Sequence, residues 1–433
     1  MSVPVMGLLF MALLFGLLLL RQPVWLALAL CGIIGNMLLS NLTVAKLVAG
    51  TTIFDIASSY GLSVVPLFIL MGEIASKSRL SADLFKAARV VLSGMRGGLS
   101  VATICASGAF GAISGSSIAT AATMTRIAMP EMRRAGYEEG IAAASVASGG
   151  SLGILIPPSI ILVIYGSIAE VSVPKLFAAS LFPGLILLLL YGIVALAVAA
   201  RSPDRVPLDS SASVKERLKA LRQPWQFIIL FTATIGGIYL GIFSPNEAAA
   251  VGAFGAIVLG FATGNLTMVR LTEAVRVSVI TSAVLFMIII GATIFANFIV
   301  QTRLPELLLS SAREFGLQPW AVVSIIILLY IVMGCFLEGI GMMLITVPVF
   351  LPVITGYGYD PIWFGVLVVV VVELGLITPP VGMNLFIIQA QIPDTNIRTL
   401  YNGILPFLIA PLVLIAILFA LPQLTLWLPS ILY

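Results

Sequence analysis

Long apolar stretches dominate the pattern of hydrophobic and polar positions along this chain. Runs of about 20 apolar residues, the length that crosses a bilayer core as a helix, recur from residues 3–20 to the C-terminal end. Charged residues gather between these runs, and the longest polar stretch lies at residues 201–224. The pattern predicts an all-α integral membrane protein with many spans and no separate soluble domain.

Residues 130–158 and 352–380 carry the same motif. Each has a proline, a Gly-Tyr pair, a Leu-Gly pair and two consecutive prolines, and the seven matched positions are all 222 residues apart. Helices interrupted by Gly and Pro at corresponding places in two halves are typical of transporters built from two repeats. Coincidental helix kinks are the alternative, and seven matches at one offset make it the weaker one.

Composition agrees with a membrane protein and argues against an enzyme. Of the 433 residues, 60% are hydrophobic and 9% are charged, whereas a soluble domain has about 25% charged residues. The chain has no histidine, which removes the commonest general base and proton relay, and its three cysteines imply no disulfide framework. The net charge of +4 is explained by basic cytoplasmic loops, without a nucleic acid partner.

The polar stretch at residues 201–224 divides the chain. Because it is rich in Lys and Arg, the positive-inside rule predicts a cytoplasmic linker between a first repeat, residues 1–200, and a second repeat, residues 225–433. We expect each repeat to contain about five crossings and one re-entrant hairpin, and the odd number of crossings inverts the topology of the second repeat.

Each repeat is also predicted to contain a broken helix. Amphipathic segments at residues 80–95 and 304–315 are expected to lie along the membrane surface before the hairpins. The expected hairpins are at about residues 97–130 and 319–352, and the expected broken helices at about residues 137–169 and 361–390.

Interrupted helices free backbone groups that can bind ions. Freed carbonyls can coordinate a hard cation, and freed amides at a helix N-terminus can hold an anion. Ser114, Ser116 and Ser117 supply hydroxyls at the first hairpin tip, and Thr378 supplies one at the second break. Sodium suits such oxygen ligands. The alternative for the serines is close helix packing, and Asn384 either binds a substrate carboxylate or ties two helices together.

Four acidic residues lie in or near apolar runs. Glu338, beside the second hairpin tip, and Glu373, just before the second break, are candidates for gating or coupling, since intramembrane charges are costly. Glu247 follows Ser-Pro-Asn and is expected in the first turn of a helix. Glu73 is a candidate i,i+4 partner of Lys77.

Three segments resemble one family of membrane proteins across essentially the whole chain. They are GAISGSS at residues 111–117, GGSLGILIPPS at 149–159 and LGLITPPVGMN at 374–384. The chain thus resembles the large membrane subunit of TRAP transporters (tripartite ATP-independent periplasmic transporters), the DctM-like family. The resemblance implies sodium-driven import by an elevator mechanism in the bacterial inner membrane. It also implies two partners, a small four-helix membrane subunit (DctQ-like) and a periplasmic substrate-binding protein (DctP-like).

The resemblance also implies where two or more Na⁺ ions bind. The first site is expected near Ser114, Ser117, Gly153, Ile156 and Pro157, and the second near Gly334, Gly375, Thr378 and Val381. Several of these residues would act through backbone carbonyls. Ser116 and Asn384 are candidates for contact with the substrate.

The substrate is expected to be an organic acid such as a C4-dicarboxylate, sialic acid or another sugar acid. Because the chain starts with its first span, the small subunit is expected to be a separate polypeptide. One rival interpretation is a stand-alone elevator symporter for carboxylates or oxyanions that needs no binding protein. Another is a permease driven by an ATPase, which would have to be a different chain because no GxxxxGK[ST] loop is present.

Overall fold

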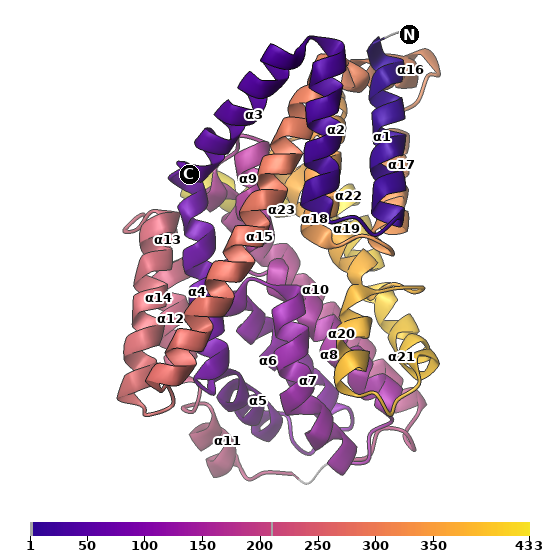
Figure 1. Ribbon diagram of the computed structural model, residues 1–433. Coiled ribbons are helices and arrows are strands. Elements are labelled where there is room, and N and C mark those ends of the chain that lie inside the picture. The colour runs from indigo at the N-terminus through magenta and orange to yellow at the C-terminus, as the bar shows by residue number, and fades with distance from the viewer. Residues whose placement is uncertain (1–2, 209–210) are drawn as a thin grey trace.

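The computed structural model describes residues 3–208 and 211–433, and these residues form helices without β-strands (Figure 1). The predicted all-α class is therefore confirmed. Residues 1–2 of the predicted first repeat and residues 209–210 of the predicted linker lie outside the described residues.

The first half of the chain consists of α1 to α10. Their bounds are α1 Val3–Leu19, α2 Val24–Leu39, α3 Leu42–Ala57, α4 Val64–Lys77, α5 Leu80–Val91, α6 Gly98–Ser114, α7 Ser117–Arg134, α8 Glu139–Ser151, α9 Ile160–Ile168 and α10 Val173–Arg201. The short α5 is polar on one face and buries Leu80, Leu84 and Phe85 on the other. It ends just before the α6–α7 hairpin.

The second half begins with the linker helix α11 and continues to α23. The bounds are α11 Val214–Ala220, α12 Trp225–Phe231, α13 Gly237–Tyr239, α14 Pro245–Ala262, α15 Met268–Gln301, α16 Leu304–Glu314, α17 Pro319–Gly334, α18 Gly339–Gly356, α19 Pro361–Ile377, α20 Met383–Gln391, α21 Ile397–Ile404, α22 Ile409–Ala420 and α23 Gln423–Leu432. The helices of the two halves correspond in order around the matched motif. For example, α7 and α18 begin at residues 117 and 339, and α8 and α19 begin at residues 139 and 361.

Two short non-helical stretches interrupt what would otherwise be long helices. Residues 155–159 separate α8 and a following turn from α9, and residues 378–382 separate α19 from α20. Each stretch contains a Pro-Pro pair, and proline lacks the N–H that would continue a helix. Ser159 restarts α9 by accepting a hydrogen bond from the Leu162 amide at 3.3 Å, and Gly382 precedes α20 with φ +61°.

Five helices of the described chain are long and apolar enough to cross a membrane by themselves. They are α10, α14, α15, α18 and the helical stretch at Ile397–Ala420. The pair α3 and α4, bent by 56° at a short break, gives a sixth candidate. Other apolar helices are shorter, and three of them end at an interruption: α6 and α17 end at hairpin tips, and α19 ends at the second break. The protein is therefore a multi-pass membrane protein with several interrupted spans.

The long helix α15 runs obliquely across the molecule and packs along α2 and α4 (Figure 1). The α6–α7 hairpin packs against α8, and α17 packs against α19. The linker helix α11 contacts α5, where Arg217 donates a hydrogen bond to the Ser93 carbonyl at 2.7 Å. At the start of α11, hydrogen bonds from the Ser213 backbone and side chain lower the pKa of Glu216. The first hairpin contacts α4 through α6, and the second hairpin contacts α15 through α18.

Candidate functional site

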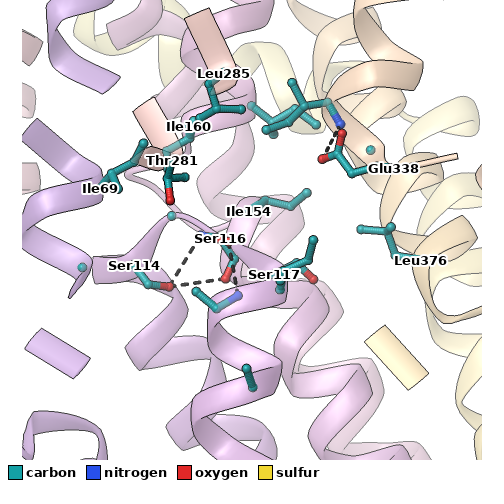
Figure 2. Close-up of a pocket in the computed structure, with 18 of the residues that line it drawn as sticks. Ile69, Ser114, Ser116, Ser117, Ile154, Ile160, Thr281, Leu285, Glu338 and Leu376 are labelled. Carbon is teal, nitrogen blue, oxygen red and sulfur yellow. Dashed lines mark hydrogen bonds between the residues drawn. The ribbon is translucent and has the colours of Figure 1, made fainter. Parts of the chain in front are cut away.

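A cavity of about 390 Å³ lies where the two hairpin tips approach α4 and α15. Figure 2 shows Ser114, Ser116 and Ser117 of the first tip, with Glu338 of the second tip on the other side. The lining also includes residues of α4 (Ile69, Gly72 and Glu73), residues of α15 (Thr281 and Leu285), and Ile160 and Leu376. The cavity thus draws residues from both halves of the chain.

The first hairpin tip is a turn between α6 and α7 that is rich in hydroxyl groups. Gly115 makes the turn possible because its φ is +61°, a conformation that side chains disfavour. Ser116 caps α7 by accepting a hydrogen bond from the Ala119 amide at 3.3 Å. The Ser114 hydroxyl lies 2.8 Å from the Thr120 hydroxyl, so the tip holds two buried hydroxyls side by side.

The first break packs directly against this tip. A Cβ added to Gly111 would lie 2.3 Å from Cα of Gly153, and one added to Gly153 would lie 3.2 Å from the carbonyl oxygen of Ser116. A Cβ on Gly115 would lie 3.1 Å from the Pro158 carbonyl oxygen. Ile156 is buried and faces Gly184 of α10. Of the first predicted sodium site, Ser114 and Gly153 therefore lie together at this junction, next to Ile156 and Pro157 in the break.

The second break meets the second hairpin in the same way. A Cβ added to Gly375 would lie 2.6 Å from Cα of Gly334, so the two backbones are in contact. The Thr378 hydroxyl donates to the Leu374 carbonyl at 2.5 Å, and Val381 lies three residues further along, within the break. The Cys335 thiol donates to the Pro379 carbonyl at 3.6 Å. The residues named for the predicted second sodium site thus lie at one junction.

One buried hydrogen-bond chain links the two halves. Ser117 donates to the Glu373 carboxylate at 3.4 Å, and Asn384 donates from its amide nitrogen to Ser117 at 2.7 Å. Glu373 and Asn384 are both 0% exposed. Asn384 therefore ties the second broken helix to the first hairpin, and Ser117 points toward the second half. The family resemblance groups Ser117 with the first break, and Ser117 directly follows Ser116, whose carbonyl oxygen packs against Gly153 of that break.

Two of the other acidic residues, Glu338 and Glu247, cap helices. Glu338 caps α18, accepting from the Ile340 amide at 3.1 Å and the Gly341 amide at 2.9 Å. Glu247 forms a capping box with Ser244 in the first turn of α14, which confirms the prediction for that residue. Lys77 pairs with Glu273 of α15 at 2.7 Å, so the ion pair that it forms is not the predicted one with Glu73.

Sequence reasoning missed three residues of this site. Thr120 completes the hydroxyl pair at the first tip, and Gly72 and Thr281 bring α4 and α15 to the cavity. A Cβ on Gly72 would lie 2.7 Å from Cα of Ser114, so α4 touches the tip itself. The position of Thr120 one helical turn after Ser116 was a usable signal, whereas nothing in the sequence pairs α15 with the hairpins.

The ligands available at both junctions are oxygen atoms of hydroxyl, carboxylate, amide and carbonyl groups. Such donors suit hard cations. In the part of the chain that the structure describes, no three His, Cys, Asp or Glu side chains come together as transition-metal ligands would.

The structure is thus that of an all-helical, multi-pass membrane protein with a cavity between two hairpin tips. The solved structure of the YdaH transporter of Alcanivorax borkumensis has the same fold, with a TM-score of 0.65 over 96% of this chain and 98% of that one. The two share 16% sequence identity, so the likeness concerns the fold alone.

The chain belongs to the family of the DctM component of tripartite ATP-independent periplasmic transporters, whose model matches residues 11–424. It is similar to the C4-dicarboxylate TRAP transporter large permease DctM of Pseudomonas aeruginosa, with 35% identity over 87% of this chain and 88% of the relative. It is also similar to the sialic acid TRAP transporter large permease SiaM of Vibrio cholerae, with 31% identity over 86% and 87% of the two chains. The protein is a transporter permease subunit and not an enzyme.

Proposed function

We propose that the protein carries an organic acid into the cell by sodium-coupled symport across the bacterial inner membrane. The observation that carries this proposal is the cavity between the two hairpin tips, with an oxygen-rich helix break beside each tip. The helix N-termini at Ser117 and Gly339 line the same cavity. Amide groups there can hold a carboxylate while the nearby oxygens hold the sodium ions.

The partners follow from the family. A periplasmic binding protein delivers the acid, and a small four-helix membrane subunit completes the complex. Two relatives are named for C4-dicarboxylate and for sialic acid, and both substrates carry a carboxylate. We therefore propose the same class of substrate for this chain.

Reconstitution tests this function directly. The chain and its small partner are placed in proteoliposomes, and uptake of labelled C4-dicarboxylates and sialic acid is measured with and without the binding protein and an inward sodium gradient. We expect uptake only when both are present. Sodium-driven uptake without the binding protein would identify a stand-alone symporter instead, and uptake that ignores sodium and requires ATP would contradict the proposal.

The movement that we propose is an elevator, in which the hairpins and broken helices move as one body against α4 and α15. The Ser76 hydroxyl of α4 lies 3.2 Å from the Thr123 hydroxyl of α7, so this contact crosses the proposed sliding surface. In a background without Cys31, Cys105 and Cys335, a disulfide between Ser76→Cys and Thr123→Cys should abolish uptake. Reduction should restore it.

A matched crosslink within the moving body is the control. Thr395, between α20 and α21, donates to Glu139 of α8 at 2.6 Å. A disulfide between Glu139→Cys and Thr395→Cys joins parts that we expect to move together, so uptake should continue after oxidation. Uptake that survives the α4–α7 disulfide would contradict the elevator movement.

A further inference from the structure

Glu373 is a fully buried carboxylate at the centre of the protein with half of its hydrogen-bonding capacity unused. It lies near the end of α19, one turn before the second break, and is 0% exposed. Its Oε2 atom accepts from Ser117, whereas Oε1 has no partner among the described residues. None of the ion pairs that the described residues form includes Glu373. Burying an uncompensated carboxylate is very costly, so Glu373 must either be protonated or have a cation beside it.

Asn384 also has a buried oxygen without a hydrogen-bond partner in the described chain. The single O–H of Ser117 is donated to Glu373, so Ser117 can only accept from Asn384, and this fixes the amide nitrogen toward Ser117. The amide oxygen of Asn384 points elsewhere, is buried, and has no partner in the described chain. Both unpartnered atoms, Oε1 of Glu373 and Oδ1 of Asn384, are acceptors. What is missing is therefore a group that is positive or donates hydrogen bonds.

The surrounding backbone compensates the carboxylate only in part. Ser117 is the first residue of α7, and the positive end of that helix dipole faces Glu373. Such an interaction contributes about 0.3–2 kcal/mol. That is small beside the several kcal/mol that burial of a carboxylate costs, so the helix end does not replace a cation.

We propose that Glu373, Ser117 and Asn384 form a cation site that takes Na⁺ at the seam between the first hairpin and the second broken helix. Glu373 supplies the negative ligand, and Ser117 and Asn384 supply neutral oxygens, a donor set that suits a hard monovalent ion. The site adds a carboxylate and an amide to the hydroxyl and carbonyl ligands at the two helix breaks. It joins α7 to α19 and α20, so the bound ion holds the two halves together.

This inference rests on the proposed sodium coupling, and its test reads ion binding rather than transport. The purified full-length protein is titrated with NaCl against choline chloride at constant ionic strength, and its unfolding temperature is followed. Equilibrium binding of radioactive ²²Na⁺ counts the ions. In Glu373→Gln we expect the half-saturating sodium concentration of the thermal shift to rise by about tenfold or more. We also expect one fewer bound ion per chain than in the wild type.

Glu247→Gln is the matched control. Glu247 is also an acidic residue near a helix end, but it is exposed, lies outside the cavity lining, and already accepts hydrogen bonds from the Ser244 backbone and side chain. The variant should keep the wild-type number of bound sodium ions even if it unfolds at a lower temperature. If Glu373→Gln does not fold, Asn384→Ala gives the second test, because it removes a neutral ligand and should also lower sodium affinity.

Glutamine has the shape of a protonated glutamic acid, and this makes the result decisive. If a proton rather than sodium neutralises Glu373, Glu373→Gln will bind sodium with wild-type stoichiometry and affinity, and the proposed site is wrong. In that case sodium-driven uptake by the wild type would remain intact, so the proposed function would stand. A wild type that neither binds ²²Na⁺ nor responds to the sodium gradient would overturn both.

Discussion

The two junctions of hairpin and broken helix share a backbone design but differ in their surroundings. At the first junction, residues 151–161 are all buried, and the tip carries Ser114, Ser116 and Ser117. At the second, Pro380 is exposed and Phe336 at the tip is 59% exposed. In both, a glycine of the hairpin touches a glycine of the broken helix. The first break is therefore enclosed by protein, whereas the second break reaches the protein surface.

The two halves share their backbone contacts but differ in the side chains that cap the helices. Gly153 and Gly375 occupy matched positions 222 residues apart, and both make backbone contact with a hairpin. The helix caps at the tips are not matched in chemistry, because α7 is capped by a serine hydroxyl and α18 by the Glu338 carboxylate. Both junctions therefore require a close contact between the hairpin backbone and the broken-helix backbone, whereas the polar side chains differ from one junction to the other.

We predict the largest effect for variants that add a side chain where the hairpin backbone touches the backbone of the broken helix. In Gly111→Ala the new Cβ would lie 2.3 Å from Cα of Gly153, and in Gly334→Ala it would lie 2.9 Å from Cα of Gly375. Overpacking against backbone costs about 1–3 kcal/mol. We expect Gly111→Ala to be near the upper end and Gly334→Ala near the lower end. The change in apparent unfolding temperature and the loss of uptake measure both.

Gly16→Ala is the control for these variants, since a Cβ at Gly16 meets nothing within 4 Å. It should leave the unfolding temperature close to that of the wild type. If Gly334→Ala proved more harmful than Gly111→Ala, the first junction would not be the tighter of the two, and the contrast drawn above would be wrong.

The sequence predicts the interruptions of helices far better than it predicts their partners. A Pro-Pro pair or a Gly-Ser tip acts locally, because it removes a backbone donor or permits an unusual φ, and regular helix is interrupted at residues 155–159 and 378–382. The bond between Ser117 and Glu373 joins residues 256 positions apart. Such contacts depend on how α7 packs against α19 and α20, which local patterns do not encode.

The same distinction explains the errors at individual charges. Glu247 follows a serine within one turn, so its capping role was readable from the sequence. Lys77 was matched with Glu73 by helical spacing, yet it pairs with Glu273, which α15 brings alongside α4. Local rules therefore work for caps and breaks, and fail where a distant helix supplies the partner.

The smaller predicted effect concerns one hydroxyl at each junction. Ser117→Ala removes two buried hydrogen bonds and leaves Glu373 and Asn384 without that partner, whereas Thr378→Ala removes one bond at a half-buried position. Unmade buried bonds cost about 1–3 kcal/mol and an ordinary bond about 0.5–1.5 kcal/mol. We therefore expect the sodium concentration for half-maximal uptake to rise roughly tenfold in Ser117→Ala and roughly threefold in Thr378→Ala.

Ser324→Ala provides the baseline, because the Ser324 hydroxyl is exposed and bonds only within α17, to the Trp320 carbonyl at 2.8 Å. Its sodium dependence should match that of the wild type. Equal shifts in Ser117→Ala and Thr378→Ala would mean that burial does not distinguish the junctions. If sodium activates both variants as it does the wild type, the sodium ions do not bind at the Ser117 and Thr378 hydroxyls. A larger rise of the half-maximal sodium concentration in Ser117→Ala than in Thr378→Ala would indicate that transport depends most on an ion bound at the first junction. That junction is joined to the second half of the chain through Glu373.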